Sequence, residues 1–163
     1  MKIKIIFMFI LTGLILFTNG CSSKALRVTE KPLPSLDNNK TVSITLFNLE
    51  NYTDTPRAGM RAANIVEGIL NAKGYTVIYN NAQADDAKDA LAKENKSDYY
   101  MTGAVSEWRY KTGIDGEPAV SLRLALYNTK TNELVWSGVG ADNSWGNASI
   151  GTTAQSLIEN MLQ

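Results

Sequence analysis

The sequence predicts an α/β (α+β) fold in which helices pack on a mixed β-sheet. Segments with alternating apolar residues, typical of strands, recur between residues 42 and 139. Segments with apolar residues at helical spacing separate the first of these strands, and another closes the chain. The expected order is β-α-β-α-β-β-β-α, with parallel crossovers in the first half and antiparallel hairpins in the second.

The first strand and helix are expected on either side of a polar loop. Apolar and polar residues alternate over 42–46, which is typical of a strand. Thr55 is suited to an N-cap and Pro56 to the first helical position, and apolar residues follow at helical spacing over 58–70. Gly74 is suited to the residue that ends the helix.

The rest of the chain, from residue 75 onward, is expected to be rich in strands. A strand at 75–79 and a helix at Asp85–Lys96 come first, the helix with Asp at its start and Lys at its end. Further strands are expected at 98–111, 120–126 and 134–139, with a turn at 128–132 and a polar loop at 140–148. Even-numbered residues from Tyr100 to Tyr110 are expected on one face, and Ser149 is expected to cap a last helix.

The N-terminus has the pattern of a secretory signal. Lys2 and Lys4 precede an apolar run, and Gly20 stands directly before Cys21, the single cysteine. This arrangement resembles the bacterial lipobox, in which the thiol is acylated and the chain is cut before it; an ordinary signal peptide is the alternative. Ser22, rather than Asp, favours the outer membrane. We therefore expect a signal peptide at 1–20, an acylated tether at 21–40 and one domain at 41–163.

Composition excludes several classes of function. Without Lys2 and Lys4 the mature chain has 14 Lys and Arg residues against 16 Asp and Glu, a net charge of −2. A nearly neutral chain argues against general nucleic-acid binding, which needs a basic surface. The sequence contains no His, which excludes His-dependent triads and the usual zinc ligand sets. We expect no metal and no cofactor.

Four segments of the C-terminal region and one upstream segment resemble a known family. They are Trp108-Arg109-Tyr110-Lys111, Gly113–Pro118, Leu134–Gly138, Ser144-Trp145 and, more weakly, Phe47–Thr55. Together they resemble the PelC family, outer-membrane lipoproteins of the Pel exopolysaccharide export system. The resemblance covers residues 41–163. Similar segments occur in a wider group of curli-secretion and penicillin-binding-protein-activator lipoproteins.

The resemblance implies a ring of copies of the chain, for example a dodecamer, at the periplasmic face of the outer membrane. In the family, lipid and exposed aromatic residues lie on one side and an acidic funnel on the other. The implied ligand is a cationic, partly deacetylated polysaccharide that passes to a PelB-like export porin during biofilm matrix formation. A cleft lined by one sign of charge raises the local concentration of the opposite charge.

The candidate acidic residues are Asp115 and Glu117, two residues apart in a loop bounded by glycines. From the residues alone, an ordinary solvated hairpin turn is the simpler interpretation. The resemblance implies instead that Asp115, with Glu117 as a helper, lines the polymer-facing mouth. Repetition around a ring would then give a nearly neutral subunit a strongly negative opening.

Trp145, Arg109 and Lys111 are the other candidates. Trp145 lies in a polar loop; either it folds back over the sheet edge, or it rests at the membrane interface on the side opposite Asp115. The family resemblance implies the second. Arg109 and Lys111 flank Tyr110, which suits sugar or anion binding, but a subunit contact is favoured because Arg is enriched at interfaces.

Two other classes of function are open. A glycoside hydrolase would use two carboxylates about 5–10 Å apart. Asp115 and Glu117 share one exposed turn without an obvious pocket, so no enzyme activity is expected. An activator lipoprotein that binds a periplasmic cell-wall enzyme needs a long tether. The expected tether of about 20 residues reaches at most about 70 Å, which favours a domain close to its membrane.

Overall fold

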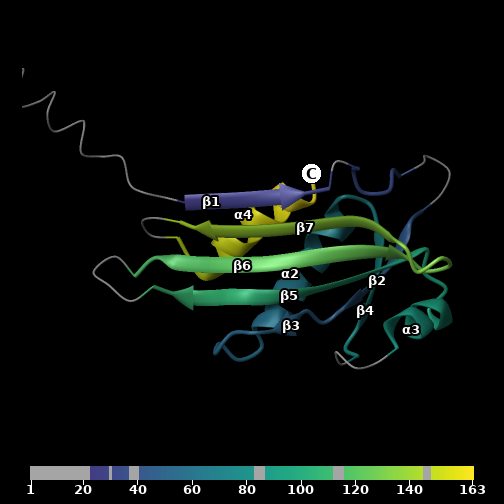
Figure 1. Cartoon of the computed structure of the whole chain (residues 1–163), viewed down its shortest axis with the longest axis horizontal. Helices are drawn as coiled ribbons and strands as arrows, with labels where there is room; N and C mark the ends of the chain where they lie inside the picture. Colours follow the sequence, from purple (N-terminus) through teal and green to yellow (C-terminus); the bar gives the residue numbers. More distant parts are fainter. Residues whose placement is uncertain (1–22, 30, 37–40, 83–86, 112–115, 145–147) are drawn as a thin grey trace, which may run out of the picture.

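The structure is a computed structural model that describes residues 23–29, 31–36, 41–82, 87–111, 116–144 and 148–163. It confirms the predicted fold class: a mixed seven-stranded sheet with helices packed on it (Figure 1). The strand order is β1-β7-β6-β5-β2-β4, and β3 pairs with β5 off this path. Among the described residues, no helix is long and apolar enough to cross a membrane.

The parallel half of the sheet is built by two crossovers around β2. Strand β2 (Ser43–Phe47) pairs in parallel with β4 (Thr76–Asn80) and with β5 (Tyr99–Tyr110), and the short β3 (Glu50–Asn51) also runs parallel to β5. The first crossover leads outward from β2 to β4 and the second leads back past β2 to β5. Because crossovers of one hand in opposite directions place their helices on opposite faces, α2 and α3 lie on different sides.

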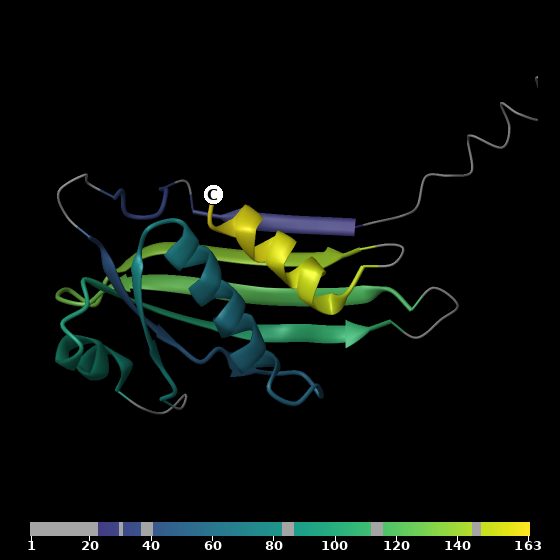
Figure 2. The same cartoon turned by 180° about the vertical axis from the view of Figure 1, so that it is seen from behind.

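The helices cover the two faces unequally. Helix α2 (Ala58–Ala72) and helix α4 (Ile150–Met161) pack together on one face, as Figure 2 shows from that side. The short α3 (Lys88–Glu94) packs on the other face, where Ala92 contacts a small cluster with Phe47 and Tyr100. The face of β6 and β7 opposite α2 and α4 is therefore left without a covering helix among the described residues (Figure 1).

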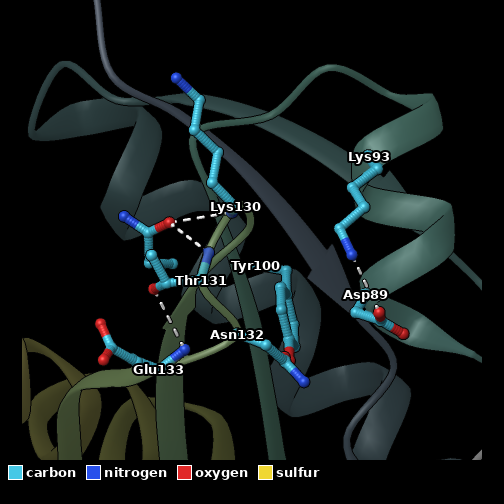
Figure 3. Close-up of polar contacts among 8 residues, drawn as sticks. Asp89, Lys93, Tyr100, Lys130, Thr131, Asn132 and Glu133 are labelled. Atoms are coloured by element: carbon cyan, nitrogen blue, oxygen red, sulfur yellow. Dashed lines mark hydrogen bonds and ion pairs between the residues drawn. The ribbon is translucent and has the colours of Figure 1, made fainter.

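The antiparallel half is formed by β5, β6 (Pro118–Asn128), β7 (Leu134–Asn143) and β1 (Ser23–Val28). The predicted turn between β6 and β7 is confirmed. The Asn128 side-chain oxygen accepts hydrogen bonds from the backbone N–H groups of Lys130 and Thr131 at 2.9 and 3.2 Å (Figure 3). Asn132 has φ 58°, a conformation that Asn tolerates in turns.

Strand β1 differs from the tether expected at residues 21–40. Its residues pair antiparallel with β7 from Ser23 opposite Asn143 to Val28 opposite Gly138. Leu26 packs against the main core, and Leu33, farther along the same segment, is buried. These residues are part of the folded sheet rather than a loose linker. Cleavage and acylation stay predictions, because residues 1–22 lie outside the described residues.

Three local expectations were wrong: one about a helix cap, one about a strand end and one about the face of a strand. The Thr55 hydroxyl donates to the Trp108 carbonyl and does not cap α2, whose N-cap is Arg57 in the left-handed region. Strand β7 continues to Asn143, inside the loop expected from residue 140, because both neighbouring strands pair with it there. A register shift between Val105 and Glu107 breaks the expected single face of β5, so that Trp108 joins the core.

The helix-end expectations at Gly74 and Ser149 are confirmed. Gly74 follows α2 with φ 96°, and its N–H donates to the Asn71 carbonyl at 3.0 Å. Ser149 and Thr152 form a reciprocal capping box at the start of α4. Trp108 and Trp136, which lie within strands β5 and β7, are buried in the core at 2% and 1% exposure.

Candidate functional site

One end of the sheet gathers most of the residues singled out in the sequence. Strand β1 starts there, β5 ends, β6 starts and β7 ends, so that Arg109 pairs with Ala119, Ala119 with Asn143, and Asn143 with Ser23. We call this the anchor end, because Ser23 is two residues from Cys21. The expected lipid, the hairpin that contains Asp115 and the loop that contains Trp145 are thus all attached to one end.

Asp115 and Trp145 themselves lie outside the described residues. Their described neighbours Gly116 and Ser144 are next to the start of β6 and the end of β7, both at the anchor end. The chain therefore enters both segments at the same end of the sheet. The expectation that Asp115 and Trp145 act on opposite sides requires their side chains to point apart from this shared end.

Glu117 is held by a network that joins β5, β6 and β7. Its carboxylate lies 3.6 Å from the Lys111 Nζ and accepts a hydrogen bond from the Asn143 side-chain nitrogen at 3.3 Å. Its backbone carbonyl accepts the Lys111 N–H at 2.7 Å. The Glu117 side chain is 14% exposed. These contacts close the hairpin. Lys111 also offsets much of the negative charge of Glu117, which the sequence analysis expected to face the polymer beside Asp115.

Arg109 and Lys111 both form ion pairs within the chain. Arg109 lies 2.8 Å from the Glu107 carboxylate on its own strand and remains 57% exposed. Lys111 pairs with Glu117, as described above. Between them, the Tyr110 hydroxyl accepts the N–H of Ile150 at 3.1 Å, which ties the end of β5 to the start of α4. The assignment of Arg109 and Lys111 to a subunit contact stays a prediction.

A further ion pair links β1 to the same end. The Lys24 Nζ lies 3.8 Å from the carboxylate of Asp142, a residue that is only 8% exposed. This contact joins β1 to β7 close to the expected lipid. Together with the register of the two strands, it fixes where the N-terminal segment meets the domain.

The loop that follows β3 brings the upstream motif against the WRYK motif. Asn51 accepts hydrogen bonds from the backbone and hydroxyl of Thr53 at 3.1 and 2.8 Å, and Thr55 reaches the Trp108 carbonyl. Tyr52 and Asp54 line a shallow pocket of about 420 Å³ together with Glu107 and Arg109. The two motifs that carry the resemblance are therefore adjacent in space.

Asp54 is an acidic residue that the sequence analysis quoted but did not assign. It is exposed, and the described part of the chain provides it with no ion pair or hydrogen bond. Its position after an Asn-Tyr-Thr turn close to the WRYK strand was the available signal. The described charges at the anchor end are then Lys24, Arg57, Arg109 and Lys111 against Asp54, Glu107, Glu117 and Asp142, a balance of 0.

Tyr52 is 66% exposed, and its hydroxyl donates to the Glu50 carboxylate. This hydrogen bond and the negative charge of Glu50 raise the pKa of Tyr52 above its ordinary value, with a smaller opposing effect from Arg123. Glu50 also lies 3.8 Å from the Arg123 guanidinium, so the phenol belongs to a charged cluster on the uncovered face.

Three of the four carboxylates described at the anchor end are paired with cations. Glu107, Glu117 and Asp142 each face a cation rather than a second carboxylate. Within the described ranges, no group of three or more His, Cys, Asp or Glu side chains gathers where it could hold a metal ion.

Comparison with known proteins identifies relatives among solved structures. No protein-family model matches the chain, and no curated protein sequence matches it. Lipoprotein GNA1162 from Neisseria meningitidis shares the fold, with a TM-score of 0.58 and 20% identity, over 73% of this chain and 94% of that one.

Two structures of PelC from Paraburkholderia phytofirmans are much more similar. One, a PelC dodecamer, is 33% identical with a TM-score of 0.75, over 86% of this chain and 95% of that one. The other, a dodecamer of a single-residue variant, is 34% identical with a TM-score of 0.76, over 86% and 96%. With this identity over nearly the whole length of these relatives, the chain belongs to the PelC family.

Proposed function

We propose that this protein is an outer-membrane lipoprotein that forms a ring and guides a cationic exopolysaccharide to a PelB-like export porin. The observation that carries the proposal is the 33–34% identity to PelC proteins that are dodecamers. Acylated Cys21 anchors each copy from the periplasmic side. Asp115 lines the mouth of the ring, Trp145 rests at the membrane interface, and the protein has no catalytic role.

The charges at the anchor end support a ring in which the negative electric field at the mouth arises from repetition of a nearly neutral subunit. The described charges of each copy balance there, and Asp115 adds one negative charge. A single exposed carboxylate interacts with a polymer charge by about 1 kcal/mol at 4 Å in water. Many copies facing one channel act together on a polymer that itself carries many charges.

Strand β1 supports a domain held close to its membrane. Because Ser23 is already paired with Asn143, residues 23–28 cannot extend as a tether. This shortens the reach that an activator-type lipoprotein would need in order to contact an enzyme in the cell wall. The same pairing favours a domain whose anchor end faces the outer membrane.

The electrostatic part of the proposal is tested by changing the charge at position 115. Asp115→Lys is expected to impair secretion of the cationic polymer more than Asp115→Asn, because it reverses rather than removes the charge. Secreted polymer is measured by lectin staining in complemented deletion strains, with protein levels matched by immunoblot.

The matched control is Glu133→Lys, the same change of charge at an exposed position at the other end of the sheet. Normal secretion by Asp115→Lys at the wild-type protein level would refute the acidic funnel. An equal defect with Glu133→Lys would mean that overall charge, rather than the anchor end, is responsible.

A further inference from the structure

A groove on the helix-covered face is not filled by any of the residues that the structure describes. It lies between α2 and α4 and has a volume of about 500 Å³. Its lining includes Ile65, Gly68, Ile69, Lys73, Gln155 and Glu159. The floor is formed by apolar and small residues of α2, while Gln155 and Glu159 of α4, joined by a 2.8 Å hydrogen bond, form one wall.

Gly68 in this groove is not required by packing within the chain. It is an exposed position inside α2, and an added Cβ would meet no atom within 4 Å. By contrast, an added Cβ at Gly59 of the same helix would lie 1.9 Å from the Leu49 carbonyl oxygen. Glycine is unfavourable in a helix interior, so Gly68 needs a reason outside the monomer. Close approach of another molecule is such a reason.

The opposite side of the sheet carries a row that is complementary to the groove. Val139 of β7 pairs with Arg27 of β1 on one side and with Arg123 of β6 on the other. Because directly paired residues project from the same face, the valine lies between two arginines. Val139 is 51% exposed, and the Arg123 side chain is 57% exposed. The row is an apolar centre between two cations, of which Arg123 lies 3.8 Å from the Glu50 carboxylate. The groove is an apolar floor with one anion, Glu159, and one cation, Lys73, in its lining.

The geometry of a ring requires two different contact surfaces on each copy. In a single closed ring of twelve, the size of the PelC relatives, successive copies are rotated by 360°/12 = 30°. With so small a rotation, the two contact surfaces lie on nearly opposite sides of the subunit. The α2–α4 groove and the Arg27–Val139–Arg123 row are on opposite faces of one sheet.

We propose that the α2–α4 groove of one copy receives the Arg27–Val139–Arg123 row of the next copy. This inference rests on the ring in the proposed function and names the surfaces that build it. Val139 packs toward Gly68, where the missing side chain allows close approach. Arg27 reaches Glu159 at the wall of the groove, because Arg123 already faces Glu50.

The experiment is sedimentation velocity of the acylated mature protein in detergent over a concentration series. Gly68→Leu fills the groove and Val139→Asp places a charge in the apolar centre of the row. Each is expected to convert the large closed species into monomers or short open species. Glu94→Leu on α3, exposed and on neither surface, is the control that should assemble as the wild type does. Circular dichroism checks that each variant is folded.

A charge exchange tests the pairing itself. Arg27→Glu and Glu159→Arg are each expected to weaken assembly, and the double variant is expected to restore part of it. Assembly of both Gly68→Leu and Val139→Asp at the wild-type level would overturn the inference while leaving the ring intact. Loss of assembly with Gly68→Leu but not with Val139→Asp would overturn the pairing of the groove with the row. A wild-type protein that is monomeric throughout would instead overturn the ring of the proposed function.

Discussion

The carboxylates at the anchor end differ in how far neighbouring cations offset their charge. Glu117 has Lys111 at 3.6 Å and a hydrogen bond from Asn143. Asp54 lies in a pocket with Arg109, but Arg109 already faces Glu107 at 2.8 Å. A positive charge at a distance, such as one on the proposed polymer, would therefore interact with Asp54 as a single charge and with Glu117 as one half of an ion pair. Sequence spacing placed Glu117 beside Asp115, and the partner on β5 could be recognised only in the folded hairpin.

Neutralising Asp54 and Glu117 one at a time should distinguish an unpaired carboxylate from one that is held in an ion pair. Glu117→Gln is expected to change polymer secretion little, because Lys111 already offsets the carboxylate. Asp54→Asn is expected to lower secretion severalfold, because no described partner offsets it. Lectin staining at matched protein levels measures both. A larger defect for Glu117→Gln than for Asp54→Asn would contradict this ranking.

Two glycines of α2 should respond in opposite ways to the same substitution. Gly59→Ala places a Cβ 1.9 Å from the Leu49 carbonyl oxygen, and the overpacking is expected to cost about 1–3 kcal/mol or more. Gly68→Ala meets no atom within 4 Å and is expected to raise the free energy of unfolding by up to about 1 kcal/mol. Urea unfolding in dilute solution measures the free energy of unfolding of both variants. Equal values would contradict the difference in free space around Gly59 and Gly68.

At the scale of the element, the sequence located strands and helices whose apolar pattern is continuous. Strands β2, β4, β6 and the helices α2 and α4 were found to within a few residues. Strand β1 was missed because Ser23–Val28 is an edge strand that carries Lys24 and Arg27 and contributes Leu26 to the main core. The change of face at Trp108 was missed because alternation alone does not reveal a bulge.

The attachment of β1 depends on the side of the strand that faces the helices. Leu26→Asp is expected to loosen β1, because Leu26 packs against the core close to Gly140. Ala25→Asp is the matched control, since Ala25 is exposed on the other face of the same strand. Limited proteolysis, followed by mass spectrometry, should cut residues 23–36 faster in Leu26→Asp only. Equal cleavage of the two variants would mean that β1 is not held by this contact.

At the scale of the whole molecule, the proposed function depends on contacts between copies of the chain. Sequence resemblance indicated the family and the ring, and the related dodecamers support both. The groove at Gly68 and the row at Val139 were not predicted, because their residues come from distant segments that only the fold brings together. A contact between copies also leaves no periodic pattern in the sequence, unlike a buried strand or helix.

The location of the protein should follow residues 21 and 22. Cys21→Ser is expected to move the protein from the outer-membrane fraction to the soluble periplasm, because no acyl chain remains to hold it. Ser22→Asp is expected to keep the lipid but to retain the protein in the inner membrane. Density-gradient fractionation with immunoblotting distinguishes these outcomes. Unchanged processing and location of Cys21→Ser would show that the signal is not a lipobox.

The pairing of β1 with β7 also determines how the domain responds to mechanical load. A force on the expected acyl anchor would enter the described fold at Ser23 and act along the axis of β1. In an antiparallel pair the hydrogen bonds are perpendicular to the strands, so such a force shears all of them together instead of opening them one by one. If the proposed function is correct, an anchor attached in this way would resist the pull of a polymer passing through the ring better than an anchor that could be peeled from the sheet.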